Sequence, residues 1–305
     1  MYKDFDEMFR AAQAAPRRTI AVAAAAEEHI IQLTGEIAKT DLCSVILVDD
    51  EQKLRSLAAE NGVSLEGVRI VDQPDPARAA LDAVSLVSGG EADVFVKGRL
   101  NTSDFLRAVL NKEHGLRRKD RPGGRLSTLT CYDVPGMKKL FFITDGGMNI
   151  APDLNAKADI LRNAVETLHA FGIERPNVAL LSANEKVSAE MQSSVDAAAL
   201  CEMAARGELP EAVYEGPMAF DVIMRPEAAR TKGIVSKVSG DVDLILVPNI
   251  DTGNALGKAI GYFAHGQAAV LMIGATHPVV MTSRAAPVKA KLNAVAFALL
   301  CCSKL

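Results

Sequence analysis

Short apolar runs alternate with longer, alanine-rich helical stretches along most of the chain. The predicted strands are Thr19–Ala24, Cys43–Val48, Val68–Val71, Asp93–Val96, Leu140–Thr144, Asn177–Ser182, Val242–Val247 and Ala268–Ile273. The predicted helices are Glu27–Ala38, Lys53–Asn61, Pro76–Ser88, Asn101–Leu110, Asn155–Phe171, Ser193–Arg206, Asn254–Phe263 and Lys289–Leu300. Parallel strands that are covered on both faces are apolar throughout, as these runs are. The pattern therefore predicts an α/β fold with a mostly parallel sheet.

One basic loop interrupts this alternation. The segment Leu116–Arg125 reads LRRKDRPGGR, and its glycine, proline and charged residues are typical of a solvated loop. The alternation resumes with the strand Leu140–Thr144, so we expect a domain boundary in front of Leu140. The positive charge of the loop, which includes Arg125, could also attract phosphate groups.

Composition narrows the class of protein. The length of 305 residues allows two α/β lobes or one large domain, and 49% hydrophobic with 24% charged residues is an ordinary globular balance. A net charge of −4 argues against a nucleic-acid-binding protein. No uninterrupted apolar segment reaches the roughly 18 residues of a membrane span. The N-terminus also lacks an apolar signal core. We therefore expect a cytoplasmic protein without a membrane partner.

The metal-binding and nucleotide-binding motifs that sequences commonly carry are missing. The five cysteines are Cys43, Cys131, Cys201, Cys301 and Cys302. They form no CxxC pair and no cluster with histidine, so we interpret them as reduced, structural thiols. The histidines are scattered without an HExxH pattern, and no GxGxxG or Walker A sequence occurs. The sequence predicts neither a metal site nor a bound cofactor.

Polar residues follow several of the predicted strands at their carboxyl ends, where open α/β sheets bind ligands. The first such segment, VKGRLNT, starts at Val96 and opens a helix. Backbone N–H groups at a helix start favour an anion, Lys97 and Arg99 add positive charge, and Gly98 permits close approach. An ordinary strand-to-helix turn that is capped by Asn101 explains the same residues, and the sequence leaves both interpretations open.

Two further segments have the same character. In ITDGGMN, which starts at Ile143, Asp145 and Asn149 flank a permissive Gly-Gly turn. In VPNIDTGN, which starts at Val247, the amides of Asn249 and Asn254 could bind a polar ligand or cap the next helix. A turn and a cap, respectively, are the structural alternatives.

A Ser-Arg pair lies soon after the last predicted strand. A guanidinium group can bind two oxygens of a phosphate and a neighbouring hydroxyl can donate a third hydrogen bond. Ser283 and Arg284 therefore form a candidate phosphate clamp. The alternative is a structural salt bridge of Arg284.

Taken together, these segments resemble the phosphate acetyl/butyryltransferase family from about Phe5 to Leu300. The stretches that carry the resemblance are KGRLNTSDFLRAVL from Lys97, ITDGGMNIAPDL from Ile143, NEKV from Asn184, EGPMAFD from Glu215, VPNIDTGNALGKAIGYFA from Val247 and TSR from Thr282. NEKV, EGPMAFD and VPNIDTGN look more like the butyryltransferase branch than the acetyltransferase branch.

The resemblance implies a two-domain α/β fold similar to isocitrate and isopropylmalate dehydrogenases, with mostly parallel sheets and an interdomain cleft. The last helix would return to the first lobe, giving domains 1–134 plus 274–305 and 135–273. The implied reaction moves a short-chain acyl group between CoA and inorganic phosphate, with acyl-CoA as a substrate and no metal or nicotinamide. We also expect a homodimer or a higher homo-oligomer.

The resemblance also implies roles for the residues already singled out. Ser283 and Arg284 would be catalytic. The residues expected to bind substrate are Lys97, Arg99, Asn101, Arg125, Asp145, Asn149, Asn249 and Asn254.

The chain departs from the family pattern in two places. Similar butyryltransferases usually carry an aspartate where this chain has Ala286, so no carboxylate follows Arg284 closely to act as a base. A histidine that often follows the basic loop is replaced by Thr128. Three alternatives stay open: an enzyme that acts on acetyl-CoA, a protein that binds CoA or acyl phosphate with weakened catalysis, and a metal-dependent decarboxylating dehydrogenase. The last needs clustered aspartates for a metal ion, whereas Asp241 and Asp243 are isolated.

Overall fold

The computed structural model describes residues 1–118, 120–121, 124–282 and 286–302. Its contacts divide the chain into two compact units. The N-terminal unit comprises Phe5–Gly124 and Ala269–Leu305, and the middle unit comprises Met1–Asp4 and Arg125–Ala268. The chain thus passes between units after residues 4, 124 and 268, whereas the sequence places the domain limits at 134 and 273. The assignment of those domains stays a prediction.

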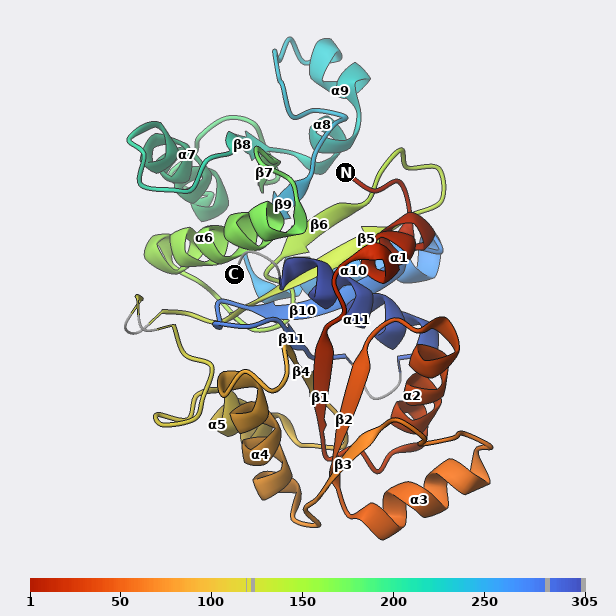
Figure 1. The fold of residues 1–305 in the computed structure, drawn as a ribbon. Helices are drawn as coiled ribbons and strands as arrows, with labels where there is room; N and C mark the ends of the chain where they lie inside the picture. Colours follow the sequence, from red (N-terminus) through yellow and green to blue (C-terminus); the bar gives the residue numbers. More distant parts are fainter. Residues whose placement is uncertain (119, 122–123, 283–285, 303–305) are drawn as a thin grey trace. The chain divides into compact units, whose positions relative to one another are not determined.

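The N-terminal unit is a doubly wound α/β unit (Figure 1). Its helices are α1 (Phe5–Ala14), α2 (Glu28–Thr40), α3 (Glu51–Glu60), α4 (Pro76–Ser88), α5 (Thr102–Val109) and α11 (Val288–Cys301). Its strands are β1 (Thr19–Ala23), β2 (Ser44–Asp49), β3 (Arg69–Asp72), β4 (Val94–Lys97), β11 (Val279–Val280) and most of β10 (Gln267–Ile273). They are ordered β3-β2-β1-β4-β11-β10, and β10 alone of these runs antiparallel to its neighbour.

The strand register of this unit brings several loops to one edge. Ala23 of β1 is paired with Lys97 of β4, and Val280 of β11 is paired with Val96. These strands are parallel, so their carboxyl ends share an edge, where open α/β sheets hold their ligands. Figure 1 shows α2 and α3 on one face of the sheet and α4 and α5 on the other. Helix α11 packs against α1 and α2.

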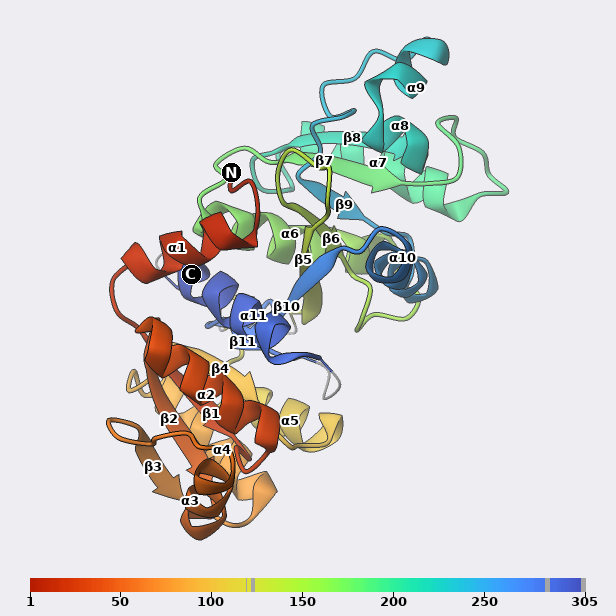
Figure 2. The same cartoon turned by 90° about the vertical axis from the view of Figure 1, so that its right-hand side faces the viewer.

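The middle unit is built in the same way. Its helices are α6 (Leu154–Phe171), α7 (Gln192–Ala205), α8 (Phe220–Met224), α9 (Pro226–Thr231) and α10 (Ile250–Phe263). Its strands are β5 (Ser127–Asp133), β6 (Phe141–Thr144), β7 (Asn177–Leu181), β8 (Val213–Met218) and β9 (Leu244–Leu246), in the order β5-β6-β9-β7-β8. Only the β5–β6 pair among these is antiparallel. In Figure 2, α6 and α10 lie on opposite sides of β5 and β6.

The predicted mostly parallel α/β fold is confirmed, but some elements escaped prediction. The sequence indicated no helix at α1, although Phe5, Met8 and Ala12 recur at helical spacing and are buried there. Strand β8 was missed because it contains Gly216 and Pro217, which normally interrupt strands; it lies at the end of the strand order, where proline is tolerated. The strands β5 and β11 and the short helices α8 and α9 were not predicted either.

Candidate active site

The turn after β4 is fixed by its own backbone. The N–H groups of Gly98 and Arg99 donate to the carbonyl oxygens of Ala23 and Ala24, at 2.9 and 2.8 Å. A β carbon on Gly98 would lie only 2.3 Å from the Ala24 oxygen. Gly98 therefore permits the close approach of the β1 loop, and these two N–H groups are not free to bind an anion. Any anion site at this turn must rely on side chains.

The side chains of the same turn have different surroundings. Lys97 Nζ donates to the Leu100 carbonyl at 2.6 Å and lies 6.0 Å from the ring centroid of Phe105. Asn101 caps α5, because its Oδ1 accepts from the Asp104 N–H at 2.8 Å. Arg99 is exposed at the tip of the turn. Lys97 and Asn101 therefore shape the turn that presents the Arg99 guanidinium to solvent.

In the middle unit, Asp145 is the centre of a hydrogen-bond network directly after β6. Its carboxylate is 2% exposed and accepts hydrogen bonds from the backbone N–H groups of Gly147, Met148 and Asn149 at 3.0 to 3.1 Å. The Thr128 hydroxyl and the Asn149 amide donate to it as well. A buried carboxylate is stable only with such a set of donors. Asp145 therefore holds the whole Gly-Gly loop.

Asn149 connects this network to the basic loop. Its Oδ1 accepts from the Arg125 guanidinium at 3.0 Å, while its Nδ2 donates to the Leu126 carbonyl at 3.0 Å and to Asp145. The Arg125 carbonyl in turn accepts from Asn163 Nδ2 at 2.6 Å. Arg125 is thus an exposed cation that is held in place by buried neighbours. Three predicted residues, Arg125, Asn149 and Asp145, form one chain of contacts. Sequence reasoning missed Asn163, because a lone asparagine inside a helical pattern carries no signal.

Thr128 stands where the family resemblance implies a histidine, and its contacts show what the residue does here. Thr128 is 2% exposed, its hydroxyl donates to Asp145, and its carbonyl accepts from the Thr144 hydroxyl at 2.7 Å. Gly147 packs against it, since a β carbon there would lie 3.2 Å from the Thr128 hydroxyl oxygen. Thr128 therefore supports the loop and is sealed from solvent.

The two glycine-containing motifs of the middle unit touch through their backbones. A β carbon on Gly146 would lie 3.0 Å from the carbonyl carbon of Gly253, and the Ile250 N–H donates to the Ile150 carbonyl at 3.0 Å. Asn249 is the N-cap of α10, since its Oδ1 accepts from the N–H and the hydroxyl of Thr252 at 2.9 and 2.8 Å. Asn254 is exposed on the same helix. The structure therefore gives Asn249 the capping role, with its amide N–H groups left for other partners.

The predicted catalytic pair, Ser283 and Arg284, lies outside the described residues. The chain that leads to it is described up to Thr282, two residues after β11. Lys291 Nζ, from the first turn of α11, donates to the Thr282 hydroxyl at 3.4 Å and is 4% exposed. Sequence reasoning did not single out Lys291, because its burial depends on how α11 packs.

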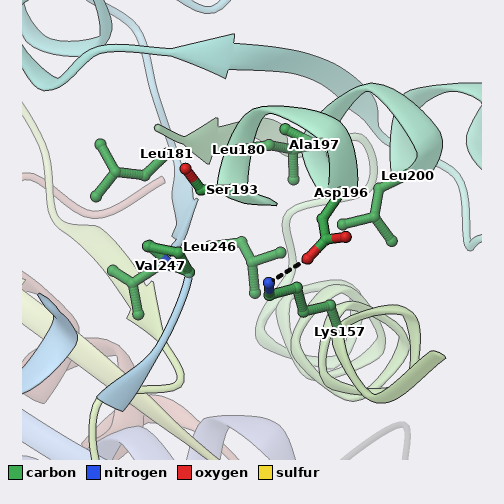
Figure 3. A pocket seen from close by; sticks show the side chains of 10 residues that line it. Lys157, Leu180, Leu181, Ser193, Asp196, Ala197, Leu200, Leu246 and Val247 are labelled. Atoms are coloured by element: carbon green, nitrogen blue, oxygen red, sulfur yellow. Dashed lines mark hydrogen bonds and ion pairs between the residues drawn. The ribbon is translucent and has the colours of Figure 1, made fainter. Parts of the chain in front are cut away.

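A small cavity in the middle unit lies beside a buried ion pair. Lys157 of α6 and Asp196 of α7 are both 5% exposed and approach to 2.5 Å, and Figure 3 shows them pointing toward each other. The cavity has a volume of about 10 Å³ and is otherwise lined mainly by leucines of β7, α7 and β9. That is room for about one water molecule, so no acyl chain fits.

A larger hollow joins two of the family-like stretches. It has a volume of about 390 Å³ and is lined by Glu185 of NEKV and by Glu215–Met218 of EGPMAFD, together with Cys201 and Ile234. The Glu215 carboxylate accepts from the Lys237 N–H at 2.8 Å, which ties the wall of the hollow in place. The NEKV and EGPMAFD stretches, which both carry the family resemblance, therefore line the same hollow.

Three further properties of the described residues concern metal binding, membrane spans and the cysteine thiols. Among them, no three His, Cys, Asp or Glu side chains gather closely enough to hold a metal ion together. None of the helices in this part of the chain has the length and apolar character to cross a membrane. Burial raises the pKa of Cys43 and Cys302 to about 12, and that of Cys201 to about 11, so these thiols stay protonated at neutral pH.

Comparisons with known proteins identify the family. The model of the phosphate acetyl/butaryl transferase family matches residues 76–299. The phosphate butyryltransferase of Clostridium beijerinckii is 39% identical over 300 residues, which cover 98% of each chain. The phosphate acetyltransferase of Rhizobium meliloti is 42% identical over 297 residues, covering 97% of this chain and 92% of the relative.

Solved structures agree with the fold. A branched-chain phosphotransacylase from Enterococcus faecalis V583 has a TM-score of 0.83 and 31% identity, covering 94% of this chain and 100% of that one. A 4-hydroxythreonine-4-phosphate dehydrogenase from Klebsiella pneumoniae, 15% identical, has a TM-score of 0.62 with the same coverage, so the dehydrogenase-like fold is confirmed as well. The full-length match, the solved relative and the family model all lead to one result: the chain belongs to the phosphate acetyl/butaryl transferase family.

Proposed function

We propose that the chain transfers a short-chain acyl group between CoA and inorganic phosphate, with butyryl-CoA as the favoured acyl donor. The observation that carries this proposal is the match to phosphate butyryltransferase over 98% of both chains. The hydrogen bonds that connect Arg125 through Asn149 to Asp145 support it, because an exposed guanidinium that is held in place can bind a phosphate.

In the proposed reaction, a phosphate oxygen attacks the thioester carbonyl and the carbon–sulfur bond breaks. The phosphate loses its proton and the departing CoA sulfur gains one, so the products are acyl phosphate and CoA thiol. Arg284, with Arg125 or Arg99 as a second cation, neutralises the anionic reactants. Ser283 donates to the phosphate or to the developing oxyanion. Positioning can lower the barrier by roughly 7–11 kcal/mol, and a thiolate leaves readily, so no strong base is required.

We assign supporting roles to the remaining predicted residues. Asn249 and Asn254 orient the acyl carbonyl, and for Asn249 the amide N–H groups do this because its oxygen caps α10. The proposal further includes Lys97 and Asn101, which shape the turn that carries Arg99. Neither a metal nor a nicotinamide takes part, since arginine charge meets the electrostatic requirement.

The proposal extends to the setting in which the protein works. Five free cysteines suit a reducing cytoplasm. We propose a homodimer or a higher homo-oligomer, and helix α10 supports this, because Tyr262 and Phe263 at its end are 80% and 86% exposed. Light scattering of the purified protein at several concentrations tests the oligomeric state.

An acetyl-specific enzyme is the second candidate, and the 42% identity to a phosphate acetyltransferase favours it. Thiol release from butyryl-CoA and acetyl-CoA, with and without phosphate and with a chelator present, separates the two. We expect phosphate-dependent release that resists chelation and a higher kcat/KM for butyryl-CoA. A preference for acetyl-CoA would select the second candidate, and binding of CoA without turnover would indicate a protein that has lost catalysis.

The clamp of Ser283 and Arg284 is tested in the same assay. Replacing Arg284 with Gln should lower the rate by roughly 30- to 1000-fold, equivalent to about 2–4 kcal/mol of transition-state stabilisation. Arg284→Lys should recover only part of this, because an ammonium group cannot form the two-pronged bond. The matched control is Arg55→Gln, whose guanidinium is exposed and pairs with Glu51. If Arg284→Gln melts and turns over like the parent, the clamp must be sought at Arg99 or Arg125.

A further inference from the structure

The buried lysine on α11 stands out in the N-terminal unit. Lys291 is 4% exposed, although lysine is among the side chains most rarely buried in proteins. A buried charge is costly unless polar groups compensate it. Its ammonium group donates to the Thr282 hydroxyl at 3.4 Å. The fold therefore places a cation that is costly to bury next to the segment that follows β11.

This cation lies at the edge of the sheet where ligands are expected. Thr282 follows β11, which runs parallel to β4, and β4 runs parallel to β1. The carboxylate of Glu27, at the start of α2 and just after β1, acts electrostatically on Lys291. Lys291 is thus within reach of the loops that leave β1 and β11, at the carboxyl edge of the sheet.

The charge of the Lys291 ammonium group does not serve the stability of the fold. Burial lowers the pKa of Lys291, and the Glu27 carboxylate opposes that shift. A lowered pKa means that the folded state disfavours the charged form, so the charge itself destabilises the fold. A side chain that served packing alone would be more stable as an apolar residue of similar length.

We propose that Lys291 is a positioning residue for phosphate, which acts by holding the Thr282 hydroxyl at the carboxyl edge of the sheet. This inference rests on the proposed function and adds to it a residue that the Ser-Arg pair alone does not indicate. The buried cation would also favour an anionic reactant at the same edge.

The first test replaces the charge while keeping the length of the side chain. We expect Lys291→Met to raise the KM for phosphate roughly tenfold or more and to lower kcat, with a smaller effect on the KM for acyl-CoA. Its melting temperature should be equal to or above that of the parent, because a desolvated charge is gone. Lys291→Arg should restore part of the phosphate affinity. The matched control is Lys289→Met on the same helix, where the side chain is exposed and kinetics should not change.

The second test examines the route through Thr282. Thr282→Val removes the hydroxyl and should reproduce part of the kinetic loss. Adding Lys291→Met to Thr282→Val should then cost less than Lys291→Met costs in the parent, because the two residues act together. If Lys291→Met does not fold, Lys291→Arg and Thr282→Val decide the matter by the same split between KM and kcat.

Two results would overturn the inference. One is parental kinetics for Lys291→Met in a folded protein, and the other is a Thr282→Val variant with unchanged phosphate KM. Failure of the proposed function looks different, because the parent itself would then be inactive. In that case calorimetric binding of inorganic phosphate replaces the assay, and the inference stands only if Lys291→Met binds more weakly than the parent and Lys289→Met does not.

Discussion

Gly146 and Gly253 are in backbone contact: a β carbon on Gly253 would lie 2.6 Å from the α carbon of Gly146 and 2.8 Å from a methyl group of Val247. One glycine belongs to the loop after β6 and the other to the first turn of α10. Two segments that lie about a hundred residues apart in the sequence therefore meet only because neither glycine has a side chain.

The first prediction follows from that contact. Gly253→Ala forces the backbone of one loop to move, so we expect the free energy of unfolding to fall by about 1–3 kcal/mol. Acyl transfer should weaken as well, because the loop that holds Asp145 shifts. Urea unfolding and the phosphate-dependent assay measure the two effects. The control is Gly261→Ala in the same helix, where the nearest atom would be 4.0 Å away, and which should stabilise by about 0.5–1 kcal/mol. Equal effects of both substitutions would contradict the contact.

The second prediction concerns the bridge from Asp145 to Arg125. Asn149→Ala removes the link, so we expect a loss of kcat/KM with a moderate loss of stability, about 1–3 kcal/mol, from the donors and acceptors left without partners. If Asn149 acts through the guanidinium, the Arg125→Gln variant and the double variant should have similar kinetics. Strictly additive rate losses would show that the two residues act separately.

The third prediction tests the buried pair of Lys157 and Asp196. Lys157→Met leaves a buried carboxylate without its cation, which should cost about 3–5 kcal/mol of unfolding free energy. Replacing both residues, with Met and Leu, should recover most of this loss. The exposed pair of Lys39 and Glu36 is the control, since Lys39→Met should change stability by less than about 1 kcal/mol. A double variant as unstable as the single one would argue that packing, and not charge, is decisive.

The fourth prediction concerns the cysteines. Burial raises the pKa of Cys43 to about 12 and of Cys201 to about 11, and it raises that of Cys301 well above the ordinary value. Because the thiolate is the reactive form, native protein should react slowly with a thiol reagent at pH 8, and quickly in denaturant. Single Cys→Ala variants should keep turnover within a few fold. A folded single variant without turnover would indicate a covalent acyl-enzyme.

Much of this architecture was determined by the sequence alone. The apolar runs that became β1, β2, β4, β6, β7 and β9 predicted a mostly parallel α/β sheet, because strands covered on both faces leave no polar positions. The same pattern predicted polar side chains at the carboxyl ends of strands, and the structure has Lys97 as the last residue of β4 and Asp145 directly after β6. These features depend on the pattern of residues that are close together in the chain, and a single sequence shows that pattern directly.

The tertiary structure decided what those polar residues do. Asn249 and Asn101 were open between ligand and cap, and the backbone geometry assigns the cap to both. Gly98 was open between close approach to an anion and an ordinary turn, and it faces Ala24, because the loop after β1 occupies that space. The burial of Lys291 and the reach of Asn149 to Arg125 depend on contacts between segments far apart in the chain. No local pattern encodes such contacts, since they arise from how the helices pack onto the sheet.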